Sequence, residues 1–494
     1  MSLFRKSGNC FRYGSMASAA LLGGAMMFST LASAQTPSAA ASLSPTGLKR
    51  WTTSGPEGGS VTSLVTDPVL ATALSASAAS GNLDPSFGNG GRVFTTIPRP
   101  AGFEFFYPNV EGVIVQTDGK ILVCGRFWED GISYWYGTFI VRYLPDGTLD
   151  PSFGTNGMVA VIGQGYPYGA HAIGADMALQ PDGKIVLIGT VAVAQGILVQ
   201  RYTSSGQLDT AFGNNGITTV SGRAFPAGTS VAIQPDGKIV GVGWDFDPYV
   251  KPYYDAILIF RLDANGSPDK SFGAEGTGKI FVKDGYDGAT VLLPPDGKIV
   301  VVGTLLNFVA PPALLIARYN PDGLPDSSFG TGGRVTYPID NRTYISAAAL
   351  QADGKIVVSE GSQGIVRFNS DGTLDQSFAI NGVAPFGSVF YSNVLIQSDG
   401  RIVGIGSPDF SLSRFHADGS PDSAFGTAGR ARFTINVGGT NDAHASAAAL
   451  QPDGKIVVAG HFGRYFTDSH DTIGVIRVLP GGPGVSRRRA VTRP

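Results

Sequence analysis

Cysteine is almost absent from this sequence, and charged residues are few. The 494 residues include two cysteines, and Cys10 lies in a segment that we expect to be removed, so Cys124 has no partner for an intrachain disulfide. Charged residues make up 15% of the chain and hydrophobic residues 43%, which excludes disorder for the bulk of it. The fold must therefore be stabilised by packing.

Motifs of common enzymes and metal sites are missing as well. No Gly-x-Ser-x-Gly elbow, P-loop or paired-carboxylate signature occurs. The five histidines lack zinc-like spacing, and we interpret His461, His470 and Asp471 as parts of a surface loop. Cys124 lies in the apolar run 121–125, which predicts a buried thiol. Catalytic pairs of an acid and a base that meet only in the folded protein are not visible in the sequence, so an enzyme stays an alternative.

The first 34 residues have the features of a secretory signal peptide. Three basic residues precede an apolar stretch at 16–31, and small residues at 32–34 form a cleavage site. An uncleaved anchor is the alternative, but the stretch is short for a bilayer span. We expect a secreted, periplasmic or cell-envelope protein. Cleavage leaves 33 basic and 38 acidic residues, a formal charge of −5 that gives no case for nucleic acid binding.

What the sequence does contain is a repeat. It begins at residue 82, after an Ala/Ser/Thr/Pro-rich segment (35–81) that we interpret as a flexible leader, and it ends at residue 482, before a basic tail (483–494). Its first element is Leu/Pro-Asp-x-Ser/Ala-Phe, in which we expect the Asp to cap a tight turn and the Phe to wedge between repeats. The aspartates are Asp84, Asp150, Asp209, Asp269, Asp326, Asp375 and Asp422.

Two further elements complete each repeat. The second is Asp-Gly-Lys/Arg-Ile between two β-prone runs, a strong hairpin signal that recurs every 46–64 residues. The third is an apolar strand that ends in Arg, with a Gly five residues later that indicates another turn. The arginines are Arg142, Arg201, Arg261, Arg318, Arg367, Arg414 and Arg477.

These elements predict four short strands in each repeat and no helix. We therefore expect an all-β fold, a seven-bladed β-propeller with four antiparallel strands per blade. The strand before Asp-Gly-Lys is rich in small residues, as at 446–450, and should lie innermost. Residues 91–96 should then complete the last blade and close the ring. An open β-solenoid and two stacked sandwiches are the alternatives, and the irregular repeat spacing disfavours the solenoid.

The repeats resemble the delta-60 repeat family, a propeller-like repeat of exported bacterial proteins. The resemblance covers about residues 82–482 and depends on segments such as Leu-Gln-Pro-Asp-Gly-Lys-Ile-Val-Val at 450–458. The sixth copy departs from the pattern with Ala379 after its Phe, and the segment 203–206 lacks the Asp of Asp-Gly. The resemblance implies a propeller and export, and it implies no defined activity.

A residue type that occurs in all seven repeats should have an architectural role. Each Arg sits in an apolar strand, where a charge requires a partner, and the Asp of Leu-Asp or of Asp-Gly-Lys is the candidate. Calcium is the competing interpretation, because the loop 263–269 has oxygen-bearing side chains at alternating positions. No copy has the bidentate Glu of an EF-hand, so we expect no cofactor, with calcium as the weaker alternative.

Function should lie where the repeats differ. Antiparallel strand order places the two invariant turns on one face and the two variable connections on the opposite face, which we call the variable face. Its connections carry aromatic residues suited to sugar rings or a protein partner. The tentative binding residues are Trp128, Tyr134, Trp135, Tyr136, Tyr166, Tyr168, Trp244, Tyr253 and Tyr254.

Two functions fit this surface. The first is a monomeric, non-enzymatic binding or scaffold protein for a glycan or an extracellular protein, with no nucleic acid and no membrane span. The second is an exported lyase or hydrolase acting on glycans, with its site on the same face or at the mouth of the axial channel. His, Glu or Asp side chains that converge at the axis would favour the enzyme, and a flat aromatic face would favour binding.

Overall fold

The computed structural model describes the chain from residue 80 to residue 481 with gaps. The described residues are 80–99, 107–128, 136–162, 173–191, 196–223, 225–247, 254–283, 287–307, 310–339, 345–360, 364–385, 389–435, 443–462 and 471–481. The chain separates into two units, residues 1–65 and 66–494, and every described residue belongs to the second. In these segments all regular elements are β-strands, and none is a helix long and apolar enough to cross a membrane.

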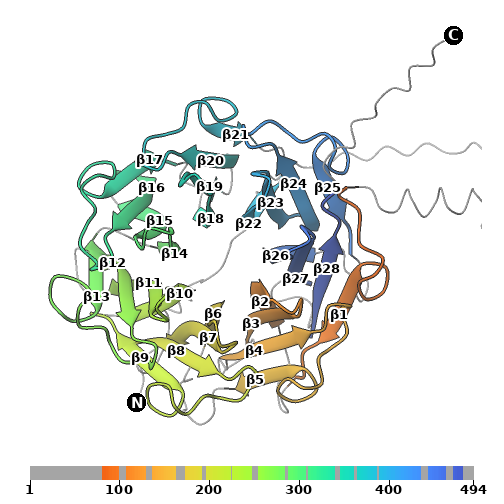
Figure 1. Cartoon of the computed structure of the whole chain (residues 1–494), viewed down its shortest axis with the longest axis horizontal. Coiled ribbons are helices and arrows are strands. Elements are labelled where there is room, and N and C mark those ends of the chain that lie inside the picture. The colour runs from red at the N-terminus through yellow and green to blue at the C-terminus, as the bar shows by residue number, and fades with distance from the viewer. Residues whose placement is uncertain are drawn as a thin grey trace, which may run out of the picture. The chain divides into compact units, whose positions relative to one another are not determined.

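The strands form seven four-stranded antiparallel sheets, which we call blades 1 to 7 (Figure 1). Blade 1 contains β2 (Tyr107–Val115), β3 (Ile121–Trp128), β4 (Tyr136–Tyr143) and β5 (Met158–Ile162). Blade 2 contains β6 (Ile173–Leu179), β7 (Ile185–Val191), β8 (Gly196–Tyr202) and β9 (Ile217–Ser221). Blade 3 contains β10 (Phe225–Ile233), β11 (Ile239–Asp247), β12 (Tyr254–Leu262) and β13 (Lys279–Lys283).

The remaining four blades repeat this order. Blade 4 contains β14 (Asp287–Leu292), β15 (Ile299–Asn307), β16 (Ala310–Tyr319) and β17 (Arg334–Pro338). Blade 5 contains β18 (Ile345–Leu350), β19 (Ile356–Glu360), β20 (Gly364–Phe368) and β21 (Val383–Pro385). Blade 6 contains β22 (Phe390–Ile396), β23 (Ile402–Ser407), β24 (Phe410–Phe415) and β25 (Arg430–Phe433). Blade 7 contains β26 (Ala443–Leu450), β27 (Ile456–Phe462), β28 (Thr472–Val478) and β1 (Arg92–Thr96).

The first strand of each repeat lies at the axis. β2, β6, β10, β14, β18, β22 and β26 are the inner edges of their sheets, and each contacts the inner strands of both neighbouring blades, so the ring is complete (Figure 1). This confirms the seven-bladed propeller and the innermost place of the small-residue strands. Every inner strand also has a β-bulge where its register to the second strand shifts by one residue.

The Asp-Gly-Lys turns follow from local chemistry. In blade 2 the N–H of Gln180 donates to the carbonyl of Lys184 at 2.8 Å, and the N–H of Gly183 donates to the carbonyl of Gln180 at 2.9 Å. Gly183 has a φ of +82°, a left-handed conformation that glycine adopts without the steric cost of a side chain. The side chain of Asp182 accepts the N–H of Lys184. The turn therefore fixes the register of β6 and β7.

The ring is closed by the start of the described chain. β1 pairs antiparallel with β28, with Arg92 opposite Ile476 and Thr96 opposite Thr472. The N–H of Arg477 donates to the carbonyl of Gly91, the same bond that Arg142 makes to Gly157 within blade 1. Residues 84–96 thus serve blade 7 as residues 150–162 serve blade 1. The predicted closure by residues 91–96 is confirmed.

The hydrophobic core lies between neighbouring blades. One cluster joins Val457, Ala459 and Val475 of blade 7 to Val123 and Val141 of blade 1. Burying an aliphatic side chain of this size contributes about 1.5–3 kcal/mol, so each blade depends on its neighbours for stability. Cys124 belongs to the next cluster, between blades 1 and 2, and is fully buried, as its apolar run predicts.

Candidate functional site at the axial hollow

In each blade, the Arg at the end of the third strand forms an ion pair with the Asp of the Leu/Pro-Asp element. The Nε to Oδ2 distances are 2.6–2.8 Å, and nearly all of these side chains are buried. The pairs are Arg142–Asp150, Arg201–Asp209, Arg261–Asp269, Arg318–Asp326, Arg367–Asp375, Arg414–Asp422 and Arg477–Asp84. Of the two candidate partners, the structure therefore places the Asp of Leu/Pro-Asp at the Arg.

The same Arg also joins its blade to the next one. Arg142 stacks on the ring of Phe153, with 4.5 Å from its guanidinium carbon to the ring centroid, and it donates to the carbonyl of Ser204 in blade 2. Its Nη2 donates to Ser152. Lys120 of the Asp-Gly-Lys turn lies 3.5 Å from the carboxylate of Asp150, so the two invariant turns share one face. Three nitrogens of Arg142 thus donate to protein acceptors, which is the pattern of a structural arginine.

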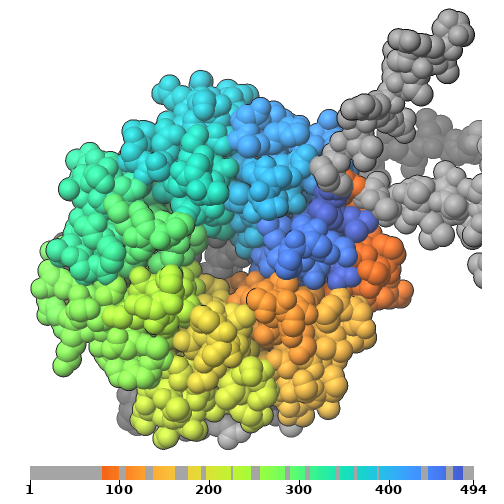
Figure 2. All heavy atoms as spheres, in the orientation of Figure 1, coloured from red at the N-terminus to blue at the C-terminus, as the bar shows by residue number. Residues whose placement is uncertain are grey.

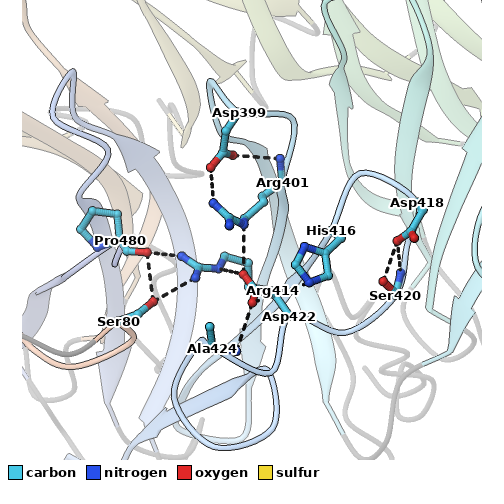
Figure 3. Close-up of polar contacts among 10 residues, drawn as sticks. All are labelled: Ser80, Asp399, Arg401, Arg414, His416, Asp418, Ser420, Asp422, Ala424 and Pro480. Carbon is cyan, nitrogen blue, oxygen red and sulfur yellow. Dashed lines mark hydrogen bonds and ion pairs between the residues drawn. The ribbon is translucent and has the colours of Figure 1, made fainter. Parts of the chain in front are cut away.

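Figure 3 shows the corresponding contacts between blades 6 and 7. Asp422 accepts from Arg414 at 2.8 Å, and Arg401 of the turn lies 3.0 Å away. Arg414 reaches both ends of the described chain, because it donates to the carbonyl of Pro480 and, at 2.9 Å, to the hydroxyl of Ser80. The contact between blades 6 and 7 thus includes Ser80 and Pro480, which are hydrogen-bonded to each other and lie 400 positions apart.

Hydrogen bonding keeps these carboxylates ionised. Burial opposes ionisation, but the hydroxyl and N–H of Ser152 and the charges of Arg142 and Lys120 lower the pKa of Asp150 to about 2. In the loop 263–269, the candidate calcium loop, the carboxylate of Asp269 likewise accepts hydrogen bonds from protein groups. Asp269 accepts from Arg261, Lys238 and Ser271. Among the described residues, no group of three or more His, Cys, Asp or Glu has metal-binding geometry.

Most of the tentative aromatic binding residues fall in connections that the structure does not describe. Tyr134, Trp135, Tyr166, Tyr168 and Tyr253 lie outside the described residues. Trp128, Tyr136 and Tyr254 are placed by backbone only, with Trp128 opposite Tyr136 and Tyr254 opposite Asp247 at the variable-face ends of their strands. Trp244 is half-buried in β11, opposite Ala227 of the inner strand β10.

Trp244 occupies a position at which the blades differ. Trp244 is the sixth residue counted from the Ile of Asp-Gly-Lys/Arg-Ile. We call this the mouth position, because in the described blades it lies toward the variable face. The described residues at the mouth position are Arg126, Thr190, Trp244, Thr304, Ser407 and His461. Figure 2 shows the blades around a central hollow, and the axial hollow is bordered by the inner strands next to these residues.

Blade 7 presents two histidines at this level. His461 in β27 lies opposite His444 in β26, and their rings stack with centroids 5.4 Å apart and planes at 28°. The Nδ1 of His461 is 3.2 Å from the hydroxyl of Ser446, and the Nδ1 of His444 is 3.1 Å from the hydroxyl of Ser407 in blade 6. Burial, together with His444 and Arg126, lowers the pKa of His461 to about 3, so the ring is neutral.

The assignment of His461 to a surface loop is therefore wrong. The residue is part of a strand and is half-buried, because the apolar run of blade 7 continues through Gly460 to Phe462. His470 lies outside the described residues, and Asp471 precedes β28.

Blade 1 adds an ion pair on the strand next to blade 7. Glu111 is the extra residue in the bulge of β2, where the other blades have Ala, Thr or Ser, and its carboxylate lies 2.8 Å from the Nε of Arg126. Burial raises the pKa of Glu111, and Arg126 opposes this. The side chains of Glu111 and Arg126 nevertheless keep 25% and 33% of their surface exposed. Glu111 and Arg126 are therefore surrounded by protein but still accessible to water, as expected for residues that line the axial hollow.

Blade 2 contributes a carboxyl group on the next inner strand. Asp176 accepts the N–H of Met177 at 2.8 Å, and the hydroxyl of Ser230 and N–H of Val231 in blade 3, both at 3.0 Å. Burial raises the pKa of Asp176 to about 6, with Glu111 adding to the effect and the three hydrogen bonds opposing it. Glu111 and Asp176 thus lie on the inner strands of neighbouring blades.

Blade 6 completes the arc with an aromatic side chain. Phe390 begins the inner strand β22 and is 62% exposed, opposite Ser407 at the mouth position. Four consecutive blades, 6, 7, 1 and 2, thus place distinct side chains around one side of the axial hollow. Sequence reasoning missed Glu111, Arg126 and Asp176. Aligning the seven copies on the Ile of Asp-Gly-Lys/Arg-Ile would have shown that the mouth position varies while the Gly before it is nearly constant.

The repeats themselves match a known family. The model described as "Domain of unknown function (DUF5122) beta-propeller" matches seven segments, which are residues 116–153, 180–212, 234–272, 295–329, 351–378, 397–425 and 451–482. The chain is a β-propeller repeat protein. No curated protein matches the sequence of this propeller.

Solved structures resemble this propeller at low sequence identity. Virginiamycin B lyase from Staphylococcus aureus has a TM-score of 0.41 and 11% identity, over 78% of this chain and 99% of that one. A gluconolactonase from Xanthomonas campestris has a TM-score of 0.36 and 12% identity, over 82% and 92%. The C-terminal WD40 domain of Sif2 has a TM-score of 0.40 and 11% identity, over 79% and 99%.

Proposed function

We propose that this protein is an exported β-propeller that binds a glycan at the variable-face end of the axial hollow. The observation that carries the proposal is the divergence of the repeats at one level of the ring, where Phe390, His444 and His461 lie on adjacent blades. Export rests on the signal-peptide features of the first 34 residues.

The chemistry of these groups suits a sugar. The exposed ring of Phe390 offers an apolar face on which the C–H side of a pyranose can stack. The neutral imidazole of His461 and the hydroxyl of Ser407 can each donate and accept hydrogen bonds, as sugar hydroxyls require. Trp244 lies half-buried at the mouth position of blade 3 and is a further aromatic residue at this level of the ring.

Glycan-array screening of the full chain, followed by calorimetry on the glycans that bind, tests this proposal. Phe390→Ala should weaken the affinity by about tenfold, because a stacked aromatic ring is worth roughly 1.5 kcal/mol. Ile380→Ala is the matched control, since Ile380 is 66% exposed but lies beside the invariant turns. Absence of glycan binding, or equal affinity of Phe390→Ala and the parent protein, would contradict the assignment.

A glycan-active enzyme at the same site is the second candidate. It is favoured by the presence of Glu111, Asp176 and His461 on the two innermost strands of three consecutive blades. Hydrolysis requires an acid that protonates the leaving oxygen and a base that takes a proton from water. A carboxyl with a pKa near 6, as in Asp176, suits the first role.

The two candidates differ in turnover. Incubation with each bound glycan should release new reducing ends, or unsaturated ends for a lyase, only if the protein is an enzyme. Asp176→Asn would then abolish product formation while binding persists. Binding without any product in the parent protein would reject the enzyme and retain the binding function.

A further inference from the structure

Arg126 differs from the repeated arginines in how its guanidinium is used. Arg142 and its counterparts direct Nε, Nη1 and, in most blades, Nη2 to acceptors of the protein. In Arg126 the Nε alone is engaged, by Glu111 at 2.8 Å, and no described residue accepts from its two terminal nitrogens. One third of its side chain is exposed. A partly exposed guanidinium whose terminal nitrogens have no acceptor among the described residues is suited to a planar, two-oxygen anion.

The neighbours of Arg126 favour such an anion. Asn109 lies opposite it on the inner strand, and the charge of Arg126 acts on His461 of the adjacent blade, whose ring stacks on His444. Both nearby carboxylates already have donors, since Glu111 is paired with Arg126 and Asp176 receives three hydrogen bonds. Among the described residues, the group of this cluster with unused donors is therefore the guanidinium of Arg126.

We infer that Arg126 binds the carboxylate of an acidic sugar, a uronate residue, at the mouth of the axial hollow, with His461 beside it. The inference rests on the proposed glycan-binding function and specifies its ligand class. The two terminal nitrogens of Arg126 donate to the two carboxylate oxygens, while Phe390 and the imidazoles contact the ring and its hydroxyls. Blades 1 and 7 are neighbours through the ring closure, which brings Arg126 and His461 to the same ligand.

Calorimetry with the full chain tests the inference by comparing oligogalacturonate with a neutral galacto-oligosaccharide of the same length. The acidic oligomer should bind at least about tenfold more tightly, as one charge-assisted pair provides. Arg126→Gln should remove this preference, so that the acidic and the neutral oligomer bind with similar affinity. Lys270→Gln is the control, because Lys270 is exposed next to an invariant turn.

Two further variants separate recognition from folding. Arg126→Lys keeps the positive charge but loses the two parallel donors of the guanidinium, so it should keep only part of the preference for the acidic oligomer. Glu111→Gln removes a competing carboxylate and should strengthen the acidic ligand's binding about threefold to tenfold, a gain that no loss of structure would produce. Equal binding of both glycans by the parent protein overturns the inference but leaves the proposed function standing. Binding of neither overturns both.

Discussion

The Nε of Arg477 lies 2.8 Å from Oδ2 of Asp84, a residue 393 positions earlier in the chain. The six other blades make this pair between residues eight positions apart. Asp84 and the β1 strand that follows it therefore supply to blade 7 what every other blade contains in its own sequence. The closing segment is held by the same chemistry as the rest of the ring.

Removing one partner of this closing pair should destabilise the whole propeller. Asp84→Asn leaves the guanidinium of Arg477 buried and unpaired, which costs about 3–5 kcal/mol. Deletion of residues 82–97 also removes β1 and the buried ring of Phe87, and should lower the melting temperature further. Thermal unfolding followed by circular dichroism measures both effects.

Asp453→Asn is the matched control for the closing pair. Asp453 is half-exposed in the Asp-Gly-Lys turn of the same blade, and its replacement should change stability by less than about 0.5 kcal/mol. A deletion variant that melts at the temperature of the parent protein would show that the ring does not depend on its N-terminal strand.

The glycine of the third-strand turn should be required by the phenylalanine of the preceding blade. Gly323 has a φ of +85°, and a Cβ there would lie 2.8 Å from the ring of Phe272. Gly332 also has a positive φ, +59°, but no atom lies within 4 Å of its Cβ position. Both Ala variants carry the left-handed strain of about 1 kcal/mol, and only Gly323→Ala adds a clash in the core.

Urea unfolding of the two Ala variants measures the difference. We expect Gly323→Ala to lose at least 1–2 kcal/mol, an order-of-magnitude figure for overpacking, more than Gly332→Ala. Equal losses would mean that the Phe272 ring is not held against this turn.

The fold could be predicted from the sequence because the turns of each repeat are determined by short local motifs. Asp182-Gly183 sets a hairpin by its own backbone preference, and the recurrence of that dipeptide sets the number of blades. Ring closure could be predicted from the order of the elements, because the first repeat begins with the Leu-Asp-x-Ser-Phe element that is missing after the last Arg strand. These features depend on short-range chemistry, which a sequence shows directly.

The site could not be predicted in the same way. Arg126 and His461 become neighbours only because blade 7 closes against blade 1, and Glu111 reaches Arg126 only because a bulge shifts the register of β2. Neither the ring contact nor the bulge has a signature in one repeat. The aromatic loops were chosen by their variability, and that interpretation stays a prediction for the residues outside the described part of the chain.

Acid should destabilise the propeller between about pH 4 and pH 2. Burial opposes ionisation, but hydrogen bonds from Ser86 and the charge of Arg477 lower the pKa of Asp84 to about 2, and Asp150 behaves alike. A carboxyl whose folded pKa is depressed contributes stability that is complete above its unfolded pKa, near 3.9, and is lost as the pH falls through the folded value. Each such group contributes roughly 2 kcal/mol.

Chemical unfolding at pH 5, 4, 3 and 2.5 measures this loss. The free energy of unfolding should fall steeply below pH 4, and the slope should be smaller in Asp84→Asn, which lacks one of the titrating groups. A free energy that stays constant from pH 5 to pH 2.5 would be incompatible with ionised aspartates in the blade contacts.

Asp176 should produce the opposite pH dependence in a separate window. Burial and Glu111 raise its pKa to about 6, so between pH 4 and pH 6 the folded protein holds a proton that the unfolded chain has lost. Stability from this group is therefore complete below pH 4 and declines as the pH rises through 6. Asp176→Asn should flatten the free energy of unfolding between pH 4 and pH 7 and leave the acid limb below pH 4 intact. If the parent protein shows no decline in that range, the carboxyl group of Asp176 is ionised throughout and the acid role proposed for it fails.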